Sequence, residues 1–422
     1  MSVTVQPPEP VAPAPVAHRS FAALRHPGYR VFFFLTMATM LADNIEHVIS
    51  YWVIFQKFNS PALGGFAVVS HWLPFLLFSV YSGALADRFD PRRMIQLGML
   101  CFMCVSIAWG LLFLTGALQM WHAMVLLIIH GLAGVIWGPA SQLLLHDIVG
   151  RNELQSAVRL SATARQLGLL CGPAVGGGLL LAFGPSHGIL LNALLYLPMI
   201  IWLWKAPYGP RFRAGGEAPK RAVKGLADIT STIRYVRLNP TILSMLLLAA
   251  GSSLFIGNAY QAQMPGFAHD LGHARADWSY SLLLAADAAG ALTAGILLES
   301  AGLLRASPRT ACILAMMWCV ALGSFAMSSS YTTALPLLFI AGFVELAFNA
   351  MAQTLVQLNA TPENRGRVIG VYSMAAMGMR TFSGITVGLA GGLIGIHASL
   401  AMSAAVFLVL IIGVLWFAQR RA

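Results

Sequence analysis

Four acidic side chains interrupt long apolar stretches of this chain, namely Asp43, Glu46, Asp287 and Glu345. A charged side chain at the centre of a bilayer costs about 2.5–3.5 kcal/mol on insertion scales. A membrane chain therefore keeps few of them without a partner or a use. A carboxylate in such a place can bind and release a proton, or it can hold a cation.

The first two acids lie close together on one predicted helix. Asp43, Glu46 and His47 fall at positions i, i+3 and i+4, which share one helix face, and Ser50 continues that face. Two carboxylates this close should titrate as a coupled pair. Such a pair suits a proton carrier, and it suits a cation site equally well. The alternative is that both side chains lie near the end of their helix in water.

The other two acids differ in their surroundings. Glu345 starts a polar face that Asn349 and Gln353 extend at i+4 and i+8, whereas Asp287 stands alone in its apolar run. A lone carboxylate in an apolar helix can simply be neutral and hydrogen-bonded. We favour a functional role for Glu345 over that alternative, and both readings stay open for Asp287.

Three basic side chains also lie inside apolar runs: His130, Arg165 and Arg380. Histidine can change its charge near neutral pH, although a lone histidine in a helix is more often a packed, hydrogen-bonded residue. The arginines either pair with the carboxylates or bind an anionic substrate, and we expect the pairing. The apolar runs contain four acids and only two arginines, and this excess of negative charge favours a cationic or neutral amphipathic substrate.

Composition shows what must position these residues. The chain is 58% hydrophobic and 10% charged, with a mean hydropathy of +0.74, whereas a soluble domain carries about 25% charged residues. Lipid must therefore cover most of the surface, and backbone groups in lipid must bond internally, which favours helices. The apolar runs have the length that a helix needs to cross a hydrocarbon core of about 30 Å.

These runs predict an all-α membrane protein with 12 transmembrane helices in two pseudo-symmetric six-helix bundles. The predicted helices span 31–56, 64–86, 94–115, 120–146, 157–183, 188–205, 241–267, 278–298, 309–328, 333–358, 366–391 and 394–418. Residues 1–30 are expected to form a disordered N-terminal segment without the features of a signal peptide. The first bundle covers 31–205, a polar linker 206–240, and the second bundle 241–422.

The basic residues predict the orientation in the membrane. Of the 26 Lys and Arg residues, 22 fall on one side in the twelve-helix count, and only Lys57 and Arg275 fall on the other. An excess of Lys and Arg marks the cytoplasmic side, so both termini should be cytoplasmic. The net charge of +11 is thereby explained by membrane topology, and no nucleic-acid partner is expected.

A repeat relates the two halves at a spacing of about 212 residues. On this spacing Glu46 corresponds to Asn258, which begins a polar run that includes Tyr260. Parallel six-helix repeats with binding sites near the midplane are typical of transporters. The first and seventh helices would then offer polar faces to a shared central cavity.

A charged segment follows the second predicted helix and returns in weaker form in the second half. It consists of Gly83, Asp87, Arg88, Arg92 and Arg93, with Gly295 and Glu299 at the repeat positions of Gly83 and Asp87. In a twelve-helix chain this pattern resembles the loop 2–3 signature of the major facilitator superfamily, with Asp90 in place of the usual glycine. We expect Asp87 to face a loop arginine or the N-terminus of a neighbouring helix such as the eleventh, as a contact that breaks when the conformation changes. The alternative is an ordinary solvated loop charge.

The fifth predicted helix carries a group of small residues and one proline: Gly168, Gly172, Pro173, Gly176 and Gly177. Small residues allow close approach of a neighbouring helix, and proline loosens the helical ladder, so plain packing explains the pattern as well as function does. The group resembles the signature of the antiporter branch, and the resemblance implies an interface that restricts leak and biases exchange. Residues 161–168 and 73–77 resemble the branch of enterobactin exporters and macrolide-efflux proteins, whose siderophore cargoes imply an anionic substrate instead.

We therefore predict a bacterial inner-membrane secondary transporter, a proton-coupled antiporter that exports amphipathic small molecules by alternating access. A proton-coupled importer and a non-transporting sensor are the alternatives. Cys101-x-x-Cys104 lacks a second pair, so we expect no metal site, and no nucleotide-binding loop is found. We expect no cofactor and no enzymatic activity, with protons, membrane lipid and a small-molecule substrate as the partners of a monomer.

Overall fold

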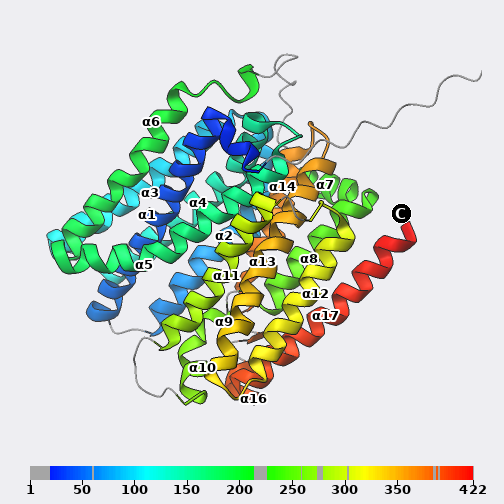
Figure 1. Ribbon diagram of the computed structural model, residues 1–422. Helices are drawn as coiled ribbons and strands as arrows, with labels where there is room; N and C mark the ends of the chain where they lie inside the picture. Colours follow the sequence, from blue (N-terminus) through cyan, green and yellow to red (C-terminus); the bar gives the residue numbers. More distant parts are fainter. Residues whose placement is uncertain are drawn as a thin grey trace, which may run out of the picture.

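The computed structural model describes residues 20–58, 61–212, 226–257, 259–272, 279–301, 304–383, 386–387 and 390–421. Within these ranges the chain is helical almost throughout, and the two halves of the sequence lie side by side (Figure 1). In the described part, nine helical segments are long and apolar enough to cross a membrane. One of them, Leu154–Phe212, contains two helices, and α1 and the broken segment after Arg365 complete the twelve.

The first half consists of long helices with short connections. After a 3₁₀ turn at Ala22–Arg25, its helices are α1 (Pro27–Phe58), α2 (Pro61–Arg88), α3 (Pro91–Leu114), α4 (Met120–Val149), α5 (Leu154–Ala193) and α6 (Leu197–Lys205). The chain turns inside α5 at Gly184, whose φ of 72° lies in the left-handed region that favours glycine. The fifth and sixth membrane helices therefore meet at Gly184.

The second half contains more and shorter helices. They are α7 (Leu226–Leu238), α8 (Pro240–Phe255), α9 (Ala259–Ala262), α10 (Met264–Asp270), α11 (Ser279–Ala301), α12 (Pro308–Ala326), α13 (Tyr331–Asn359), α14 (Arg365–Ser373), a π-helical turn (Met374–Gly378), α15 (Arg380–Ser383), α16 (Ala390–Ile394) and α17 (Ile396–Arg421). Two expectations of continuous helices are corrected here. The segment 241–267 breaks at Gly257, which has a φ of 50°, and the segment 366–391 is divided by the π-helical turn.

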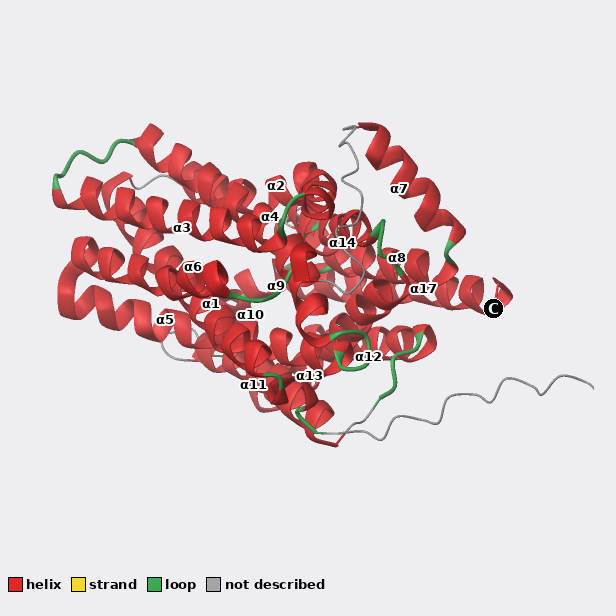
Figure 2. Cartoon of the chain, turned by 90° about the horizontal axis from the view of Figure 1, so that it is seen from above, coloured by secondary structure: helices red, strands yellow, loops and turns green. Residues whose placement is uncertain are grey.

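Two segments predicted to lie outside the bundles contain helical structure. The predicted linker 206–240 contains α7, which lies along the outside of the second half (Figure 2) and buries Thr232 and Val236. Of the N-terminal segment expected to be disordered, residues 20–30 pack against the first half. Tyr29 is fully buried, and its hydroxyl donates to the carbonyl of Ala157 at 2.8 Å. An aromatic ring with a satisfied hydroxyl provides the burial that orders this segment.

Three helices begin with the same local device, a capping side chain followed by proline. The pairs are Asp90-Pro91 at α3, Asn239-Pro240 at α8 and Ser307-Pro308 at α12. In each pair the first side chain accepts a hydrogen bond from a backbone N–H of the first turn, and proline occupies a position that needs no donor. Local sequence thus fixes where these helices start.

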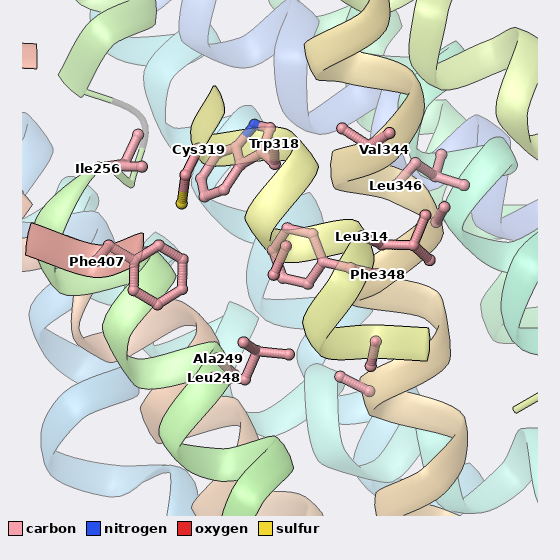
Figure 3. Close-up of a cluster of buried hydrophobic side chains, with 14 of the residues drawn as sticks. Leu248, Ala249, Ile256, Leu314, Trp318, Cys319, Val344, Leu346, Phe348 and Phe407 are labelled. Carbon is pink, nitrogen blue, oxygen red and sulfur yellow. The ribbon is translucent and has the colours of Figure 1, made fainter. Parts of the chain in front are cut away.

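Apolar side chains fill the interior of each half. In the second half, residues of α8, α12, α13 and α17 form the cluster drawn in Figure 3. The Trp318 ring lies 5.4 Å from that of Phe348 and 6.3 Å from that of Phe407, measured between ring centroids. This packing holds α13, which carries Glu345, in a fixed position relative to its neighbours.

Glycines bring the two halves into close contact. A Cβ added to Gly83 of α2 would overlap the carbonyl oxygen of Gly366 of α14, and one added to Gly295 of α11 would overlap the hydroxyl of Thr163 of α5. The halves therefore meet along α2 and α14 on one side and along α5 and α11 on the other.

Candidate functional site

Asp87 lies at the junction between α2 and α14. Its two carboxylate oxygens accept hydrogen bonds from the backbone N–H groups of Gly366 at 2.7 Å and of Arg367 at 3.0 Å. These donors form the first turn of α14, where the helix dipole favours a negative charge. The contact joins the two halves of the chain through one side chain.

The three arginines of the same motif have other partners. Arg92 pairs with Asp90 at 2.6 Å and donates to the carbonyl of Ala206, Arg93 donates to Gln96, and Arg88 lies over the Phe89 ring. These identified contacts lie within the first half, so they shape the loop and the start of α3. Asp90, which replaces the usual glycine, caps α3.

Glu299 lies at the second junction, between α5 and α11. It is 1% exposed and accepts a hydrogen bond from the hydroxyl of Ser156. Beside it, Arg159 donates to the carbonyls of Leu298 at 2.8 Å and Leu304 at 2.7 Å. Arg159 was not predicted as part of the gate, although its place among the basic residues after the fourth predicted helix was a signal.

Both junctions lie at the same end of the helices. Asp87 is at the end of α2, Glu299 at the end of α11, and their partners are at the starts of α14 and α5. The other identified hydrogen bonds between the halves, including those of Arg151 with Leu358 and of Arg365 with His146, lie at this end too. We call it the motif end. The described residues thus hold the halves together at the motif end.

In the first half, His130 joins the two carboxylates that were predicted to lie on one helix face, Asp43 and Glu46. Its Nδ1 lies 2.8 Å from Glu46 Oε1, and its Nε2 lies 2.9 Å from Asp43 Oδ1. Glu46 and His130 are 2% and 3% exposed, and the hydroxyl of Ser106 of α3 donates to the other oxygen of Glu46. These carboxylates are therefore inside the bundle and not in water at the end of α1. A histidine from α4 and a serine from α3 partner them.

Two further histidines complete this cluster. His47 Nδ1 lies 3.6 Å from Asp43 Oδ2, and the rings of His47 and His71 lie 5.0 Å apart between centroids. The His47 and His130 rings are 4.8 Å apart. His71, like Ser106, was missed from the sequence because it stands alone in α2 and gains its neighbours only when α1, α2 and α4 pack together.

In the second half, Tyr260 brings Asp287 and Glu345 together. Its hydroxyl lies 3.2 Å from Asp287 Oδ2 and 3.4 Å from Glu345 Oε2, and Gln261 Nε2 lies 3.2 Å from the same oxygen of Asp287. Tyr260 is fully buried and Asp287 is 5% exposed. Asp287 is therefore part of a shared site. Its predicted neighbour Asn258 lies outside the described residues.

The two buried arginines occupy the interface between the halves. Arg380 lies with its guanidinium carbon 5.0 Å from the centroid of the Trp72 ring, and it interacts electrostatically with Glu345. Arg165 lies near the hydroxyls of Tyr29 and Tyr372 and near Arg380. Among the described residues we identify a carboxylate neighbour for Arg380 and none for Arg165.

The glycines of α5 fit against α1. Added Cβ atoms would overlap Met40 at Gly168 and Asn44 at Gly172, whereas at Gly177 there is open space. At Gly176 a Cβ would lie 3.2 Å from the Ile45 backbone, and Pro173 lies within the helix. These contacts place α5 directly behind Asp43 and Glu46, so the group has at least a packing role.

Comparison with known proteins identifies this architecture. A family model described as "Transmembrane secretion effector" matches residues 18–421. The chain belongs to this family of major facilitator transporters. It is 25% identical over 200 residues to the uncharacterized MFS-type transporter YfiS of Bacillus subtilis, covering 46% of this chain and 45% of that protein. It is 21% identical over 173 residues to the staphyloferrin A transporter of Staphylococcus aureus, covering 41% and 44%.

The chain thus spans less than half the length of these two relatives. The crystal structure of the major facilitator transporter FucP in the outward conformation superposes with a TM-score of 0.73 at 11% identity, covering 93% of this chain and 98% of that one. The predicted fold class is confirmed: this is an all-α membrane protein with the major facilitator fold. Members of this family are transporters and not enzymes. The enterobactin and macrolide branch stays a prediction.

Proposed function

We propose that this chain is a proton-coupled exporter of small molecules in the bacterial inner membrane, working by alternating access with both termini in the cytoplasm. The observation that carries the proposal is the site at Tyr260. One phenolic hydroxyl lies within reach of both Asp287 and Glu345, inside the second half. A hydroxyl has one hydrogen, so it can donate to only one of the two carboxylates.

A single proton resolves this conflict. When both carboxylates are ionised they repel each other, whereas a protonated carboxyl donates to the tyrosine oxygen and removes the repulsion. When Glu345 is the carboxyl that takes the proton, its attraction to Arg380 is also weakened, because the two interact when both are charged. The site therefore converts the arrival of one proton into the release of one arginine.

The released arginine connects the site to the motif end. Arg380 begins α15, which follows the π-helical turn Met374–Gly378 and α14, and the first turn of α14 binds Asp87. Irregular turns of this kind are frequent at functional sites. We infer that movement of Arg380 shifts α14 and breaks the Asp87 contact, which opens the motif end. The glycines of α5 then serve the antiporter role by keeping α5 packed against α1, behind Asp43 and Glu46.

Export is favoured by two observations. The matching family is described as "Transmembrane secretion effector", and the distribution of Lys and Arg favours a cytoplasmic position for the motif end. Protons that enter from outside would then drive substrate outward. Transport of fluorescent and radiolabelled probes into everted membrane vesicles tests the direction, because an exporter accumulates its substrate in everted vesicles and an importer does not.

We infer that the substrate carries an anionic group. The count of buried charges favoured a cation, but each of the four carboxylates has a hydrogen-bonding or ionic neighbour in the structure. Arg165 has tyrosine hydroxyls and another arginine around it. An anion between Arg165 and Arg380 would satisfy both guanidinium groups.

The coupling role can be tested without knowing the substrate. Spin labels at Phe89→Cys and Glu363→Cys, in a background whose five native cysteines are replaced by serine, report the separation of the halves at the motif end. Both positions are exposed, one in each half. Double electron–electron resonance should show a distance distribution that changes with pH.

The double substitution Asp287→Asn with Glu345→Gln should remove this pH dependence, because neither side chain can then ionise. Asp270→Asn is the matched control, since Asp270 is an exposed acid of the same half. If the double variant responds to pH as the control does, the coupling role of the Tyr260 site is refuted.

A further inference from the structure

The cluster around His130 brings together the donor atoms of a metal site. His47, His71 and His130 each offer a ring nitrogen, and these three nitrogens lie within 4.8 Å of one another. The three residues come from α1, α2 and α4. An oxygen of Asp43 lies 2.9 Å from His130 Nε2, and its other oxygen lies 3.6 Å from His47 Nδ1. Three imidazole nitrogens thus lie close together, and the carboxylate of Asp43 lies beside two of them.

Glu46 fixes the orientation of the His130 ring, as a carboxylate commonly does for a metal-binding histidine. Its Nδ1 is 2.8 Å from Glu46, and the hydroxyl of Ser106 fixes the other oxygen of that carboxylate. A carboxylate that accepts a proton from Nδ1 leaves the lone pair on Nε2, the nitrogen on the side of Asp43. The Nε2 contact with Asp43 has the distance of an ion pair without the alignment of a hydrogen bond. With its lone pair on Nε2, the His130 ring would repel the oxygen of Asp43, and a cation bound to both atoms would remove this repulsion.

His71 supplies a second, independent observation. Its Nδ1 is buried and has no hydrogen-bond partner among the described residues. A buried polar atom without a partner costs about 1–3 kcal/mol. The His71 ring lies 5.6 Å from that of His130 and 5.0 Å from that of His47, between centroids. A metal ion would satisfy this nitrogen.

The charge of the cluster also calls for a cation. Asp43 and Glu46 face it from α1, Ser106 from α3 and the three imidazoles from α1, α2 and α4. The nearest arginine identified, Arg380, lies over the ring of Trp72, the residue after His71, and interacts electrostatically with His71. Because His130 contacts both carboxylates, it would bind the ion only as a neutral imidazole, and in that state a divalent ion would balance the charges of Asp43 and Glu46.

We propose that His47, His71, His130 and Asp43 form a binding site for a divalent first-row transition-metal ion with the ligand preference of zinc. Imidazole nitrogen and carboxylate oxygen are ligands that Zn²⁺ and Co²⁺ accept in tetrahedral sites. Around Zn²⁺ these ligand atoms would be about 3.4 Å apart, given Zn–N distances of about 2.0–2.1 Å. The ring nitrogens, which now lie within 4.8 Å of one another, would have to approach to this spacing when the ion binds.

This site is separate from the proton site at Tyr260, which belongs to the other half. It also differs from the expectation drawn from the sequence, which considered cysteine pairs and predicted no metal. The histidines are far apart in the chain and have no local ligand spacing. Only the packing of α1 against α2 and α4 reveals them as a set.

Metal binding by the purified full-length chain, with any affinity tag removed, tests the proposal. Titration with Co²⁺ should produce the visible absorption bands of a four-coordinate ion, and Zn²⁺ should displace it at one ion per chain by calorimetry. His71→Ala should weaken binding by more than about tenfold, as should Glu46→Gln, which disturbs the residue that orients His130. His71→Ala should still fold, because the side chain makes no identified hydrogen bond.

His187→Ala is the matched control, since His187 is exposed and lies outside the cluster. It should bind Co²⁺ and Zn²⁺ as the wild type does, and so should the Asp287→Asn, Glu345→Gln variant. Zn²⁺ should raise the melting temperature of the wild type and leave that of His71→Ala unchanged. The proposal is overturned if no ion binds, or if His71→Ala and Glu46→Gln bind as tightly as His187→Ala. Either result leaves the Tyr260 proposal untouched.

Discussion

Substitution of Asp87 tests the proposed conformational change most directly. Asp87→Asn removes the charge, and it leaves one oxygen in place of the two that accept from Gly366 and Arg367. A hydrogen bond to a charged group contributes about 1.5–3 kcal/mol against about 0.5–1.5 kcal/mol for a neutral one, and the interaction with the helix dipole adds about 0.3–1 kcal/mol. Loss of one bond and weakening of the other should therefore cost the closed motif end about 2–4 kcal/mol.

This cost corresponds to about a 30- to 700-fold shift in the equilibrium between closed and open motif ends, at about 1.4 kcal/mol per factor of ten. Asp87 is only partly buried, so solvent screening moves the expected value toward the lower end. Folding should be preserved, because the contact is made between the halves and not within one. Substrate binding should be largely retained while transport slows, since each cycle must close this end again.

The spin-label pair at positions 89 and 363 measures the shift directly, and vesicle transport measures the turnover. Asp90→Asn provides a control in the same loop, because asparagine keeps the helix cap and the Arg92 ion pair that it weakens lies outside the contact between the halves. Its distance distribution should match that of the wild type. A distribution for Asp87→Asn that coincides with that of Asp90→Asn, together with a normal transport rate, would show that the contact is not a gate.

Two further predictions follow from packing and charge. Gly342→Ala should lower the stability of the second half by about 1–3 kcal/mol, because the new Cβ would overlap the carbonyl of Asp287, whereas Gly413→Ala in open space should raise it by about 0.5–1 kcal/mol. Opposite shifts of melting temperature check this pair, and equal shifts would contradict it. Arg165→Ala should weaken the binding of anionic probes relative to matched cationic probes, with Glu345→Gln as the comparison. An undiminished preference for the anion in Arg165→Ala would contradict the inferred role.

Composition and periodicity predicted the helical membrane fold well, because lipid leaves the backbone few alternatives. Residues that break helices were predicted less well. Gly257 and the π-helical turn at Met374–Gly378 interrupt segments whose apolar character is continuous. At Gly378 a Cβ would meet the backbone of Leu76 at 2.5 Å, so contact with α2 influences this break as much as local propensity does. Single-chain patterns carry no information on such contacts.

The candidate site was predicted only in part, because its contacts join different helices. Helical spacing placed Asp43 and Glu46 on one face, because that relation is local. Their partner His130 was noted only as a lone histidine, and His71 was not noted at all, since both lie on other helices. Tyr260 was placed in a polar run, but its contacts with Asp287 and Glu345 depend on how α9 packs against α11 and α13. Contacts across helices are set by tertiary packing and not by spacing.

The two halves differ in a way that indicates which one moves. In the first half, Glu46 is held by groups from α3 and α4, so its cluster ties three continuous helices into one body. In the second half, Tyr260 and Arg380 lie on short helices beside the breaks at Gly257 and Met374–Gly378. Discontinuous helices line the sites of many transporters because their free ends can rearrange at low cost. A charge change at the Tyr260 site would therefore be relieved by movement of α9 and α15, while the first half keeps its shape and acts as the surface against which α14 opens and closes.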